Sequence, residues 1–264
     1  MDLGLSGKVA IVGGSSKGMG RATAGRLAEE GARVTLVARG EAGLAKAAEE
    51  IAAATTPEQV LSVCADLSRA GDVDRVISET VRAFGKLDIL VNNVGGPPPG
   101  LAASATEDQW RAALDQNFFS VQRMCVQALP LMIKQGGGRI VTILSYSLKE
   151  PVANLVLSNA VRMAALGFSK TLADEVGPDN ITVNVVGPGA VMTERYLSLV
   201  NVWAKDAGVT PEEMLAQKQA AIPLRRIGKP EEMADLIAFL VSERASYITG
   251  AFIPLDGGLI RAPL

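Results

Sequence analysis

Near its start the chain reads Lys8-Val-Ala-Ile-Val-Gly-Gly-Ser-Ser-Lys-Gly-Met-Gly20, an apolar run that passes through a glycine-rich turn into a helical pattern. The run predicts a buried strand. Glycines let backbone amides approach a pyrophosphate, and the amino end of the following helix faces its negative charge. Such a turn can also serve strand–helix packing alone, but its place between the first strand and the first helix favours nucleotide binding. The residues expected to contact the nucleotide here are Gly14, Ser16, Lys17, Gly18 and Met19.

Outward from this stretch, β-branched apolar runs alternate with helical patterns. Strands are predicted at 8–13, 34–38, 60–65, 87–92, 139–145, 181–187 and 251–255. Alternation of strand and helix at this spacing gives a doubly wound sheet whose ligands lie outside the carboxyl ends of the strands. The fold class is therefore α/β and Rossmann-like, with a predominantly seven-stranded parallel sheet and helices on both faces.

The domain organisation follows from length and composition. The 264 residues are 48% hydrophobic and 4% aromatic, without a linker or an internal repeat, so we expect a single domain over residues 1–264. The longest stretch without a strand, 193–223, contains a helix start at Thr210-Pro-Glu-Glu. We interpret residues 193–223 as a lid over the substrate.

Charge and targeting signals narrow the class of partner. The 26 basic and 28 acidic residues give a net charge of −2 with no run of one sign, which argues against nucleic acid and anionic membranes as partners. The opening residues fit neither a signal peptide nor a membrane span, so a cytoplasmic protein with a small-molecule substrate is expected.

The residues available for chemistry are restricted. The sequence has no histidine, which excludes the Ser-His-Asp triad, the usual Cys-His pair and most zinc sites, and we expect no metal. Cys64 and Cys125 are expected to be small core residues rather than disulfide partners or nucleophiles.

The residues at the end of the second predicted strand indicate which dinucleotide the protein prefers. A carboxylate there usually binds the ribose 2′-hydroxyl, but this chain has Val37-Ala38-Arg39. A guanidinium suits a 2′-phosphate, and Lys17 is a candidate for a second positive charge. Alternatively, Arg39 and Lys17 are ordinary surface residues that contact solvent. NADP(H) is predicted in preference to NAD(H).

From Gly7 to Gly258 the chain resembles the classical short-chain dehydrogenase/reductase family. Besides the glycine turn, the resemblance rests on Asp66-Leu67, Asn92-Asn93-Val94-Gly95, Asn117, Ser145, Pro188-Gly189-Ala-Val191-Met-Thr193, Arg226-Ile-Gly-Lys-Pro-Glu-Glu-Met, Tyr247-Ile-Thr-Gly250 and Asp256-Gly257-Gly258. It implies cofactor contacts from Asp66, Leu67, Asn93, Gly95, Pro188, Gly189, Val191 and Thr193, catalytic roles for Asn117 and Ser145, and a homotetramer.

Two positions depart from that family. Its Tyr, thirteen residues after the serine, and its Lys, one helical turn later, are Ser158 and Arg162 here, and Gly167-Phe-Ser-Lys170 secures the register. Serine is a poorer acid than a phenol, whereas Arg162 keeps a charge that can bind ribose hydroxyls. Gly13 also replaces a family Thr in the glycine turn. Ser145, Ser158 and Arg162 are predicted to form a pocket that polarises an oxyanion.

Three hypotheses follow from the altered centre. The first is an oxidoreductase that transfers hydride between NADP(H) and a ketone or secondary alcohol, similar to 3-oxoacyl reductases, with a Ser-Ser-Arg centre. The second is a non-redox lyase or isomerase on the same scaffold, and the third is a catalytically silent nucleotide-binding protein. Tyr146 and Tyr196 are the nearest phenols in sequence that could replace the missing acid, but we interpret both as structural rather than catalytic.

Apolar segments indicate the polarity of the substrate and the presence of a subunit interface. The expected pocket walls, 97–101, 148–155 and the lid, carry few charges and predict a neutral or partly apolar substrate, whereas the Arg225-Arg226 pair leaves an anionic acyl-carrier substrate as an alternative. The helix predicted at 154–176 has apolar residues beyond its sheet-facing side, at Leu155, Val156, Val161 and Met163. We expect part of it to be buried against another subunit, in a tetramer or a dimer.

Overall fold

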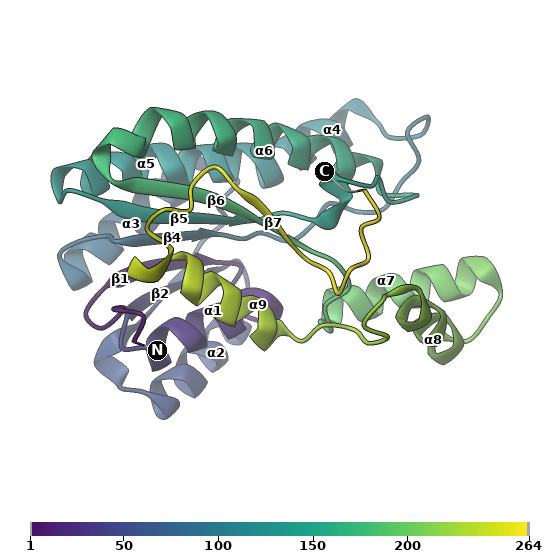
Figure 1. Ribbon diagram of the computed structural model, residues 1–264, viewed down its shortest axis with the longest axis horizontal. Helices are drawn as coiled ribbons and strands as arrows, with labels where there is room; N and C mark the ends of the chain where they lie inside the picture. The colour runs from purple at the N-terminus through teal and green to yellow at the C-terminus, as the bar shows by residue number, and fades with distance from the viewer. Residues whose placement is uncertain (1, 263–264) are drawn as a thin grey trace.

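Within residues 2–262, which the computed structural model describes, seven strands form one parallel sheet in the order β3-β2-β1-β4-β5-β6-β7 (Figure 1). The strands are β1 (Val9–Gly13), β2 (Arg33–Ala38), β3 (Val60–Cys64), β4 (Ile89–Asn92), β5 (Gly138–Ile143), β6 (Ile181–Pro188) and β7 (Phe252–Leu255). The predicted seven-stranded, doubly wound sheet is confirmed. Because the direction of winding reverses between β1 and β4, the loops after these two strands diverge and leave a crevice.

Helices cover both faces of the sheet. They are α1 (Gly18–Glu29), α2 (Glu41–Ala54), α3 (Ala70–Phe84), α4 (Glu107–Leu114), α5 (Ser120–Lys134), α6 (Val156–Val176), α7 (Glu194–Ala207), α8 (Pro211–Ala221) and α9 (Pro230–Leu240), with a π-helical segment η2 (Asp115–Phe119) between α4 and α5. In Figure 1 α1, α2 and α9 lie on one face and α4, α5 and α6 on the other. Short 3₁₀ turns are η1 (Pro57–Gln59), η3 (Tyr146–Leu148), η4 (Gly177–Asp179) and η5 (Glu243–Ala245).

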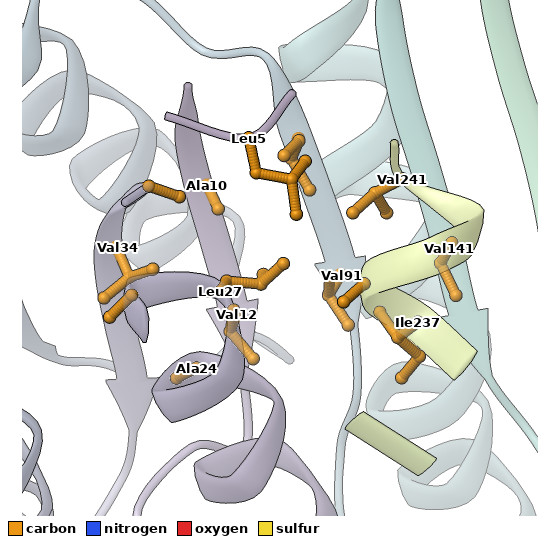
Figure 2. Packing of buried hydrophobic residues seen from close by; sticks show 14 of the residues in the cluster. Leu5, Ala10, Val12, Ala24, Leu27, Val34, Val91, Val141, Ile237 and Val241 are labelled. Atoms are coloured by element: carbon orange, nitrogen blue, oxygen red, sulfur yellow. The ribbon is translucent and has the colours of Figure 1, made fainter. Parts of the chain in front are cut away.

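Two hydrophobic cores follow from the alternation of side chains along the strands. In β1, Ala10 and Val12 face α1, α2 and α9, whereas Ile11 faces α3 and α5. Figure 2 shows the first core, where Leu27 of α1 and Ile237 of α9 pack beside Val12 and Val91. Both faces of the central strands are buried, as expected for parallel strands covered by helices.

The segment predicted as a lid forms two helices, α7 and α8, which project from one end of the sheet (Figure 1). Thr210 caps α8 as expected: its hydroxyl accepts a hydrogen bond from the Glu213 amide, and the Glu213 carboxylate accepts one from the Thr210 amide. Val200, Ala204 and Met214 give this pair of helices a small core of its own.

Some expectations for single residues were wrong. Cys64 is exposed, because β3 is the edge strand and alternate side chains at its end point to solvent, whereas Cys125 is buried as predicted. Val161 is covered by its own chain, against Ala113 and Leu157, so of the apolar set on α6 only Met163 is largely exposed, at 49%. No helix within residues 2–262 is long and apolar enough to cross a membrane.

Candidate functional site

A cavity of about 1300 Å³ opens at the carboxyl edge of the sheet, over the crevice between β1 and β4. This volume exceeds the roughly 300–1,000 Å³ typical of a site for one drug-sized ligand. The loops after the first six strands and the helices α7 and α8 line it. The cavity has room for a dinucleotide and a second small molecule.

The glycine turn at one side of the cavity is held in place by the loop after β4 and by strand β2. The Asn93 amide nitrogen donates to the carbonyl oxygens of Gly13, at 3.1 Å, and Gly14, at 3.4 Å. The Ser15 hydroxyl accepts a hydrogen bond from the Val37 amide at 2.7 Å. Gly14 has φ of +56°, a conformation that a side chain disfavours. A Cβ at Gly20 would collide with the Gly14 carbonyl oxygen, so the start of α1 can contact the backbone of the turn only because residue 20 is a glycine.

The amino end of α1 faces the cavity without a competing cap. Lys17 is its N-cap residue and makes no side-chain capping bond, and the first turn contains no acidic residue. The first amides of a helix lack intrahelical partners and carry the positive end of its dipole. The turn and the amino end of α1 therefore fit a pyrophosphate. Its oxygens would accept hydrogen bonds from backbone amides at the start of α1, because no side chain caps that end of the helix.

The adenosine end of the cavity carries Arg39, Asp66 and Leu67 as predicted. Within residues 2–262 the exposed Arg39 side chain makes no hydrogen bond or ion pair, so its guanidinium is available to a phosphate. Lys17, expected beside it, instead lies 2.5 Å from the Glu194 carboxylate at the start of α7. Asp66 accepts hydrogen bonds from the amide and hydroxyl of Ser68.

Most of the predicted site residues meet in this one cavity. Those that line it are Gly14, Ser16, Lys17, Gly18, Met19, Arg39, Asp66, Leu67, Asn93, Gly95, Ser145, Ser158, Arg162, Gly189 and Thr193. Pro188, Val191 and Asn117 do not line it, since Pro188 ends the buried strand β6, Val191 is buried through its backbone bridge to Gly228, and Asn117 is buried within η2.

The two serines and Arg162 form the polar floor at the substrate end. The Arg162 Nε donates to the Ser158 hydroxyl at 3.1 Å, and its Nη1 donates to the Leu144 carbonyl at 2.7 Å. The Ser145 hydroxyl accepts a hydrogen bond from the Ser147 amide at 3.1 Å. Each hydroxyl thus accepts a protein hydrogen bond, and neither donates one within residues 2–262, so each proton is available to a substrate oxygen.

Asn117 takes a different position from the one predicted. Its amide nitrogen donates to the Ala113 carbonyl at 3.4 Å, while its oxygen is buried and has no partner within the described residues. The neighbouring Gln116 reaches the cavity instead and donates to the Gly95 carbonyl at 2.9 Å. The π-helical widening of η2 accompanies this arrangement, and such bulges are frequent at functional sites.

Two phenols, Tyr146 and Tyr196, line the same cavity as the serines. Burial raises the pKa of Tyr196 to about 12, with a further contribution from Tyr146. Burial also raises the pKa of Tyr146, assisted by the charges of Glu150 and Asp256. Both phenols therefore hold their protons more tightly than usual, which makes them hydrogen-bond donors rather than ready acids.

Sequence reasoning missed Arg195, which enters the cavity from α7. Its Nη2 donates to the Pro97 carbonyl at 2.9 Å. The pocket walls and the lid were expected to carry few charges, and the guanidinium of Arg195 in the cavity corrects that expectation. Contact between 95–97 and the start of α7 is a tertiary feature without a local sequence signal. The Arg225-Arg226 pair has ordinary surface contacts, Arg225 to the Ala220 carbonyl and Arg226 to Glu232.

The chain is similar to a family of known enzymes. Residues 14–260 match the family model described as Enoyl-(Acyl carrier protein) reductase. The NADPH-dependent reductase BacG of Bacillus subtilis is 32% identical over 98% of this chain and 100% of its own. The 3-oxoacyl-[acyl-carrier-protein] reductase FabG of Salmonella typhimurium is 34% identical over 97% of this chain and 99% of its own. The chain belongs to the short-chain dehydrogenase/reductase family.

Solved structures agree with membership of the short-chain dehydrogenase/reductase family. The crystal structure of L-sorbose reductase from Gluconobacter frateurii, in complex with NADPH and L-sorbose, superposes with a TM-score of 0.94 at 35% identity, over 99% of this chain and 100% of that one. The likeness of this short-chain dehydrogenase/reductase to that enzyme spans both the nucleotide half of the cavity and α7 and α8.

Proposed function

We propose that this protein is an NADPH-dependent reductase of the short-chain dehydrogenase/reductase type that acts on a ketone, with the reverse reaction on a secondary alcohol. The observation that carries the proposal is the juxtaposition, in one cavity, of an uncapped helix amino terminus with two serine hydroxyls and a buried guanidinium. The first feature binds a dinucleotide, and the second polarises a carbonyl oxygen. Relatives named as NADPH-dependent and 3-oxoacyl reductases support it.

The preference for NADPH over NADH rests on Arg39. Its guanidinium follows the end of β2, where the family's NAD-specific pattern has a carboxylate, and has no partner among residues 2–262. Lys17 contributes less to this preference, because its ammonium is paired with Glu194. Reductases of known structure that are similar to this chain contain NADPH.

The reaction centre consists of Ser145, Ser158 and Arg162, with Ser158 and Arg162 in place of the family's Tyr and Lys. Bound NADPH supplies the hydride. The two hydroxyls donate hydrogen bonds to the carbonyl oxygen, and the charge of Arg162 stabilises the oxyanion that develops there. The bond from Arg162 Nε to Ser158 Oγ polarises that hydroxyl, which passes its proton to the oxygen and regains one from water. Asn117 donates to the Ala113 carbonyl at the end of α4 and does not line the cavity, so it is given no contact with the substrate.

The second candidate is a non-redox lyase or isomerase. It is favoured by the absence of a phenol from position 158 and by the raised pKa of Tyr146 and Tyr196, because an oxyanion pocket without a strong acid suits enolate chemistry. A silent nucleotide-binding role is the third. Within residues 2–262 neither serine hydroxyl donates a hydrogen bond, which argues for chemistry and against a silent role. The reductase is preferred over the lyase because relatives are named as reductases.

The proposal is tested by titration of the protein with NADPH and NADH, followed by fluorescence, and by turnover of a ketone panel. We expect tight NADPH binding and measurable turnover in the wild type. The double variant Ser158→Tyr/Arg162→Lys is the comparison. Binding without wild-type turnover, together with activity in the double variant, would assign another chemistry to the native site, and no binding of either cofactor would refute the proposal.

We also propose that the protein is a homo-oligomer, a tetramer or a dimer, held together through α5 and α6. Phe119, Val126 and Ile133 are spaced seven residues apart and are 39%, 47% and 45% exposed, and Met163 of α6 is exposed as well. Such a stripe on adjacent helices on one face is typical of a subunit interface (Figure 1). Light scattering with Val126→Glu tests it, and an unchanged mass would contradict this interface.

A further inference from the structure

The guanidinium of Arg162 is buried without a counter-charge. The residue is only 8% exposed, and its hydrogen bonds go to the Ser158 hydroxyl and to the Leu144 and Ile143 carbonyls. Within residues 2–262 it has no carboxylate partner. Burial of an unpaired charge is costly, and Arg162 lines the cavity with Nη2 uncommitted.

A second guanidinium lies beside the first. The Nη2 atoms of Arg162 and Arg195 are 3.6 Å and 3.7 Å from the place where a Cβ on Gly96 would be. The pKa of Arg162 is lowered to about 10, by burial first and by the charge of Arg195 second. Two like charges on different elements, α6 and the start of α7, therefore converge on one loop. An apolar or neutral ligand leaves their repulsion uncompensated.

The acidic side chains of the cavity do not neutralise this pair. Glu194 is bound to Lys17, and Asp66 is bound to Ser68 at the adenosine end. Asp206 lies eleven residues after Arg195 on α7, about 16 Å further along the helix. A pyrophosphate on the glycine turn is served by α1. A nicotinamide ribose offers hydroxyls that accept hydrogen bonds from Arg162, but it carries no charge that would offset the two guanidinium groups.

We infer that Arg162 and Arg195 bind the carboxylate of an acidic substrate next to the carbonyl that Ser145 and Ser158 polarise. The inference rests on the proposed reductase function and names its substrate class, small oxo acids. A carboxylate has two oxygens that match the planar donors of guanidinium groups, and two such groups compensate the burial of a charged ligand. The apolar walls at Val152, Leu155 and Leu199 bind the rest of the molecule.

The test uses the protein saturated with NADP⁺, so that no bound acid is reduced during the titration, after NADPH binding has been measured by itself. A series of short 2-oxo and 3-oxo acids is titrated calorimetrically, each against its own methyl ester. We expect at least one acid to bind about ten- to a hundredfold more tightly than its ester, the gain expected for charge-assisted hydrogen bonds. In Arg195→Gln that preference falls severalfold, to the part that Arg162 supports by itself, with binding of the ester unchanged.

The controls separate this inference from the proposed function. Arg195→Lys keeps the charge and should retain part of the preference, and Arg111→Gln removes an exposed guanidinium of α4, paired with Glu107, and should change nothing. If NADPH binds but no acid exceeds its ester, the inference is overturned and the reductase stands. If Arg195→Gln weakens NADPH as much as the acid, Arg195 serves the cofactor and the inference is also overturned. Failure of NADPH to bind refutes the proposed function itself.

Discussion

The Nε of Arg162 donates a hydrogen bond to the Oγ of Ser158 over 3.1 Å, between side chains one turn apart on α6. In the proposed mechanism this pair links the charge that stabilises an oxyanion to the hydroxyl that donates to it. We expect Ser158→Ala to lower kcat about a hundredfold, the order of effect for loss of a proton donor, while NADPH affinity stays within about twofold. Steady-state kinetics and fluorescence titration measure the two quantities.

A matched control for that variant is Ser169→Ala, which removes another buried hydroxyl from α6, one that donates to the Ala165 carbonyl. It should leave kcat unchanged. If both substitutions lower kcat equally, Ser158 acts only through the stability of α6.

Cofactor choice is predicted to depend on Arg39. Arg39→Gln should weaken NADPH about ten- to a hundredfold and leave NADH unchanged, because only NADPH brings the 2′-phosphate that pairs with a guanidinium. Arg33→Gln is the control, since Arg33 is exposed at the opposite end of the same strand, β2. Equal losses for both cofactors, measured by titration, would place Arg39 outside the phosphate site.

Restoration of the family's threonine in the glycine turn is predicted to harm this protein. A Cβ at Gly13 would lie 2.6 Å from the Asn93 carbonyl oxygen, so Gly13→Thr should lower the free energy of unfolding by about 1–3 kcal/mol and weaken NADPH. Gly71→Ala is the control, because nothing lies within 4 Å of its Cβ position in α3 and alanine favours helix. Urea denaturation would contradict this account if Gly13→Thr were as stable as wild type.

The pH dependence of the reaction follows from the groups at the substrate end. The pKa of Arg162 is lowered to about 10, so its guanidinium is charged below that pH. The pKa of Tyr196 is raised to about 12, so its phenol keeps its proton over the same range. We therefore expect kcat/KM to be level between about pH 6 and 9 and to fall as the pH rises through about 10, where Arg162 loses the charge that stabilises the oxyanion. A decline centred near neutral pH would point to another titrating group.

Local patterns predicted the fold well, because the strand signal is a run of apolar residues that needs no knowledge of neighbours. All seven strands occur within two residues of the predicted bounds, as β5 shows at Gly138–Ile143. The glycine turn was predicted equally well, because the spacing of its glycines depends on the local backbone conformation alone. The errors arose where tertiary position decides: Cys64 is exposed because β3 is an edge strand.

The substrate end was the least predictable part of the site. Arg195 reaches the cavity only because the start of α7 meets the loop at Pro97, a contact between residues far apart in sequence. Asn117 was placed in the catalytic centre by resemblance, yet the π-helical turn of η2 buries it and presents Gln116 to the cavity. Sequence spacing gives the order of such residues along a helix, whereas the side that faces the ligand depends on packing.

Transfer of the hydride itself is the most direct measurement of the central claim. The wild-type protein would be mixed with a ketone or oxo acid that binds its NADPH complex and with NADPH that carries deuterium at its transferable position. Mass spectrometry of the alcohol should then find one deuterium on the carbinol carbon, and Ser145→Ala/Ser158→Ala should abolish the label without loss of NADPH binding. A substrate that binds the NADPH complex and is converted without deuterium, or is never reduced, would contradict the assignment as a reductase.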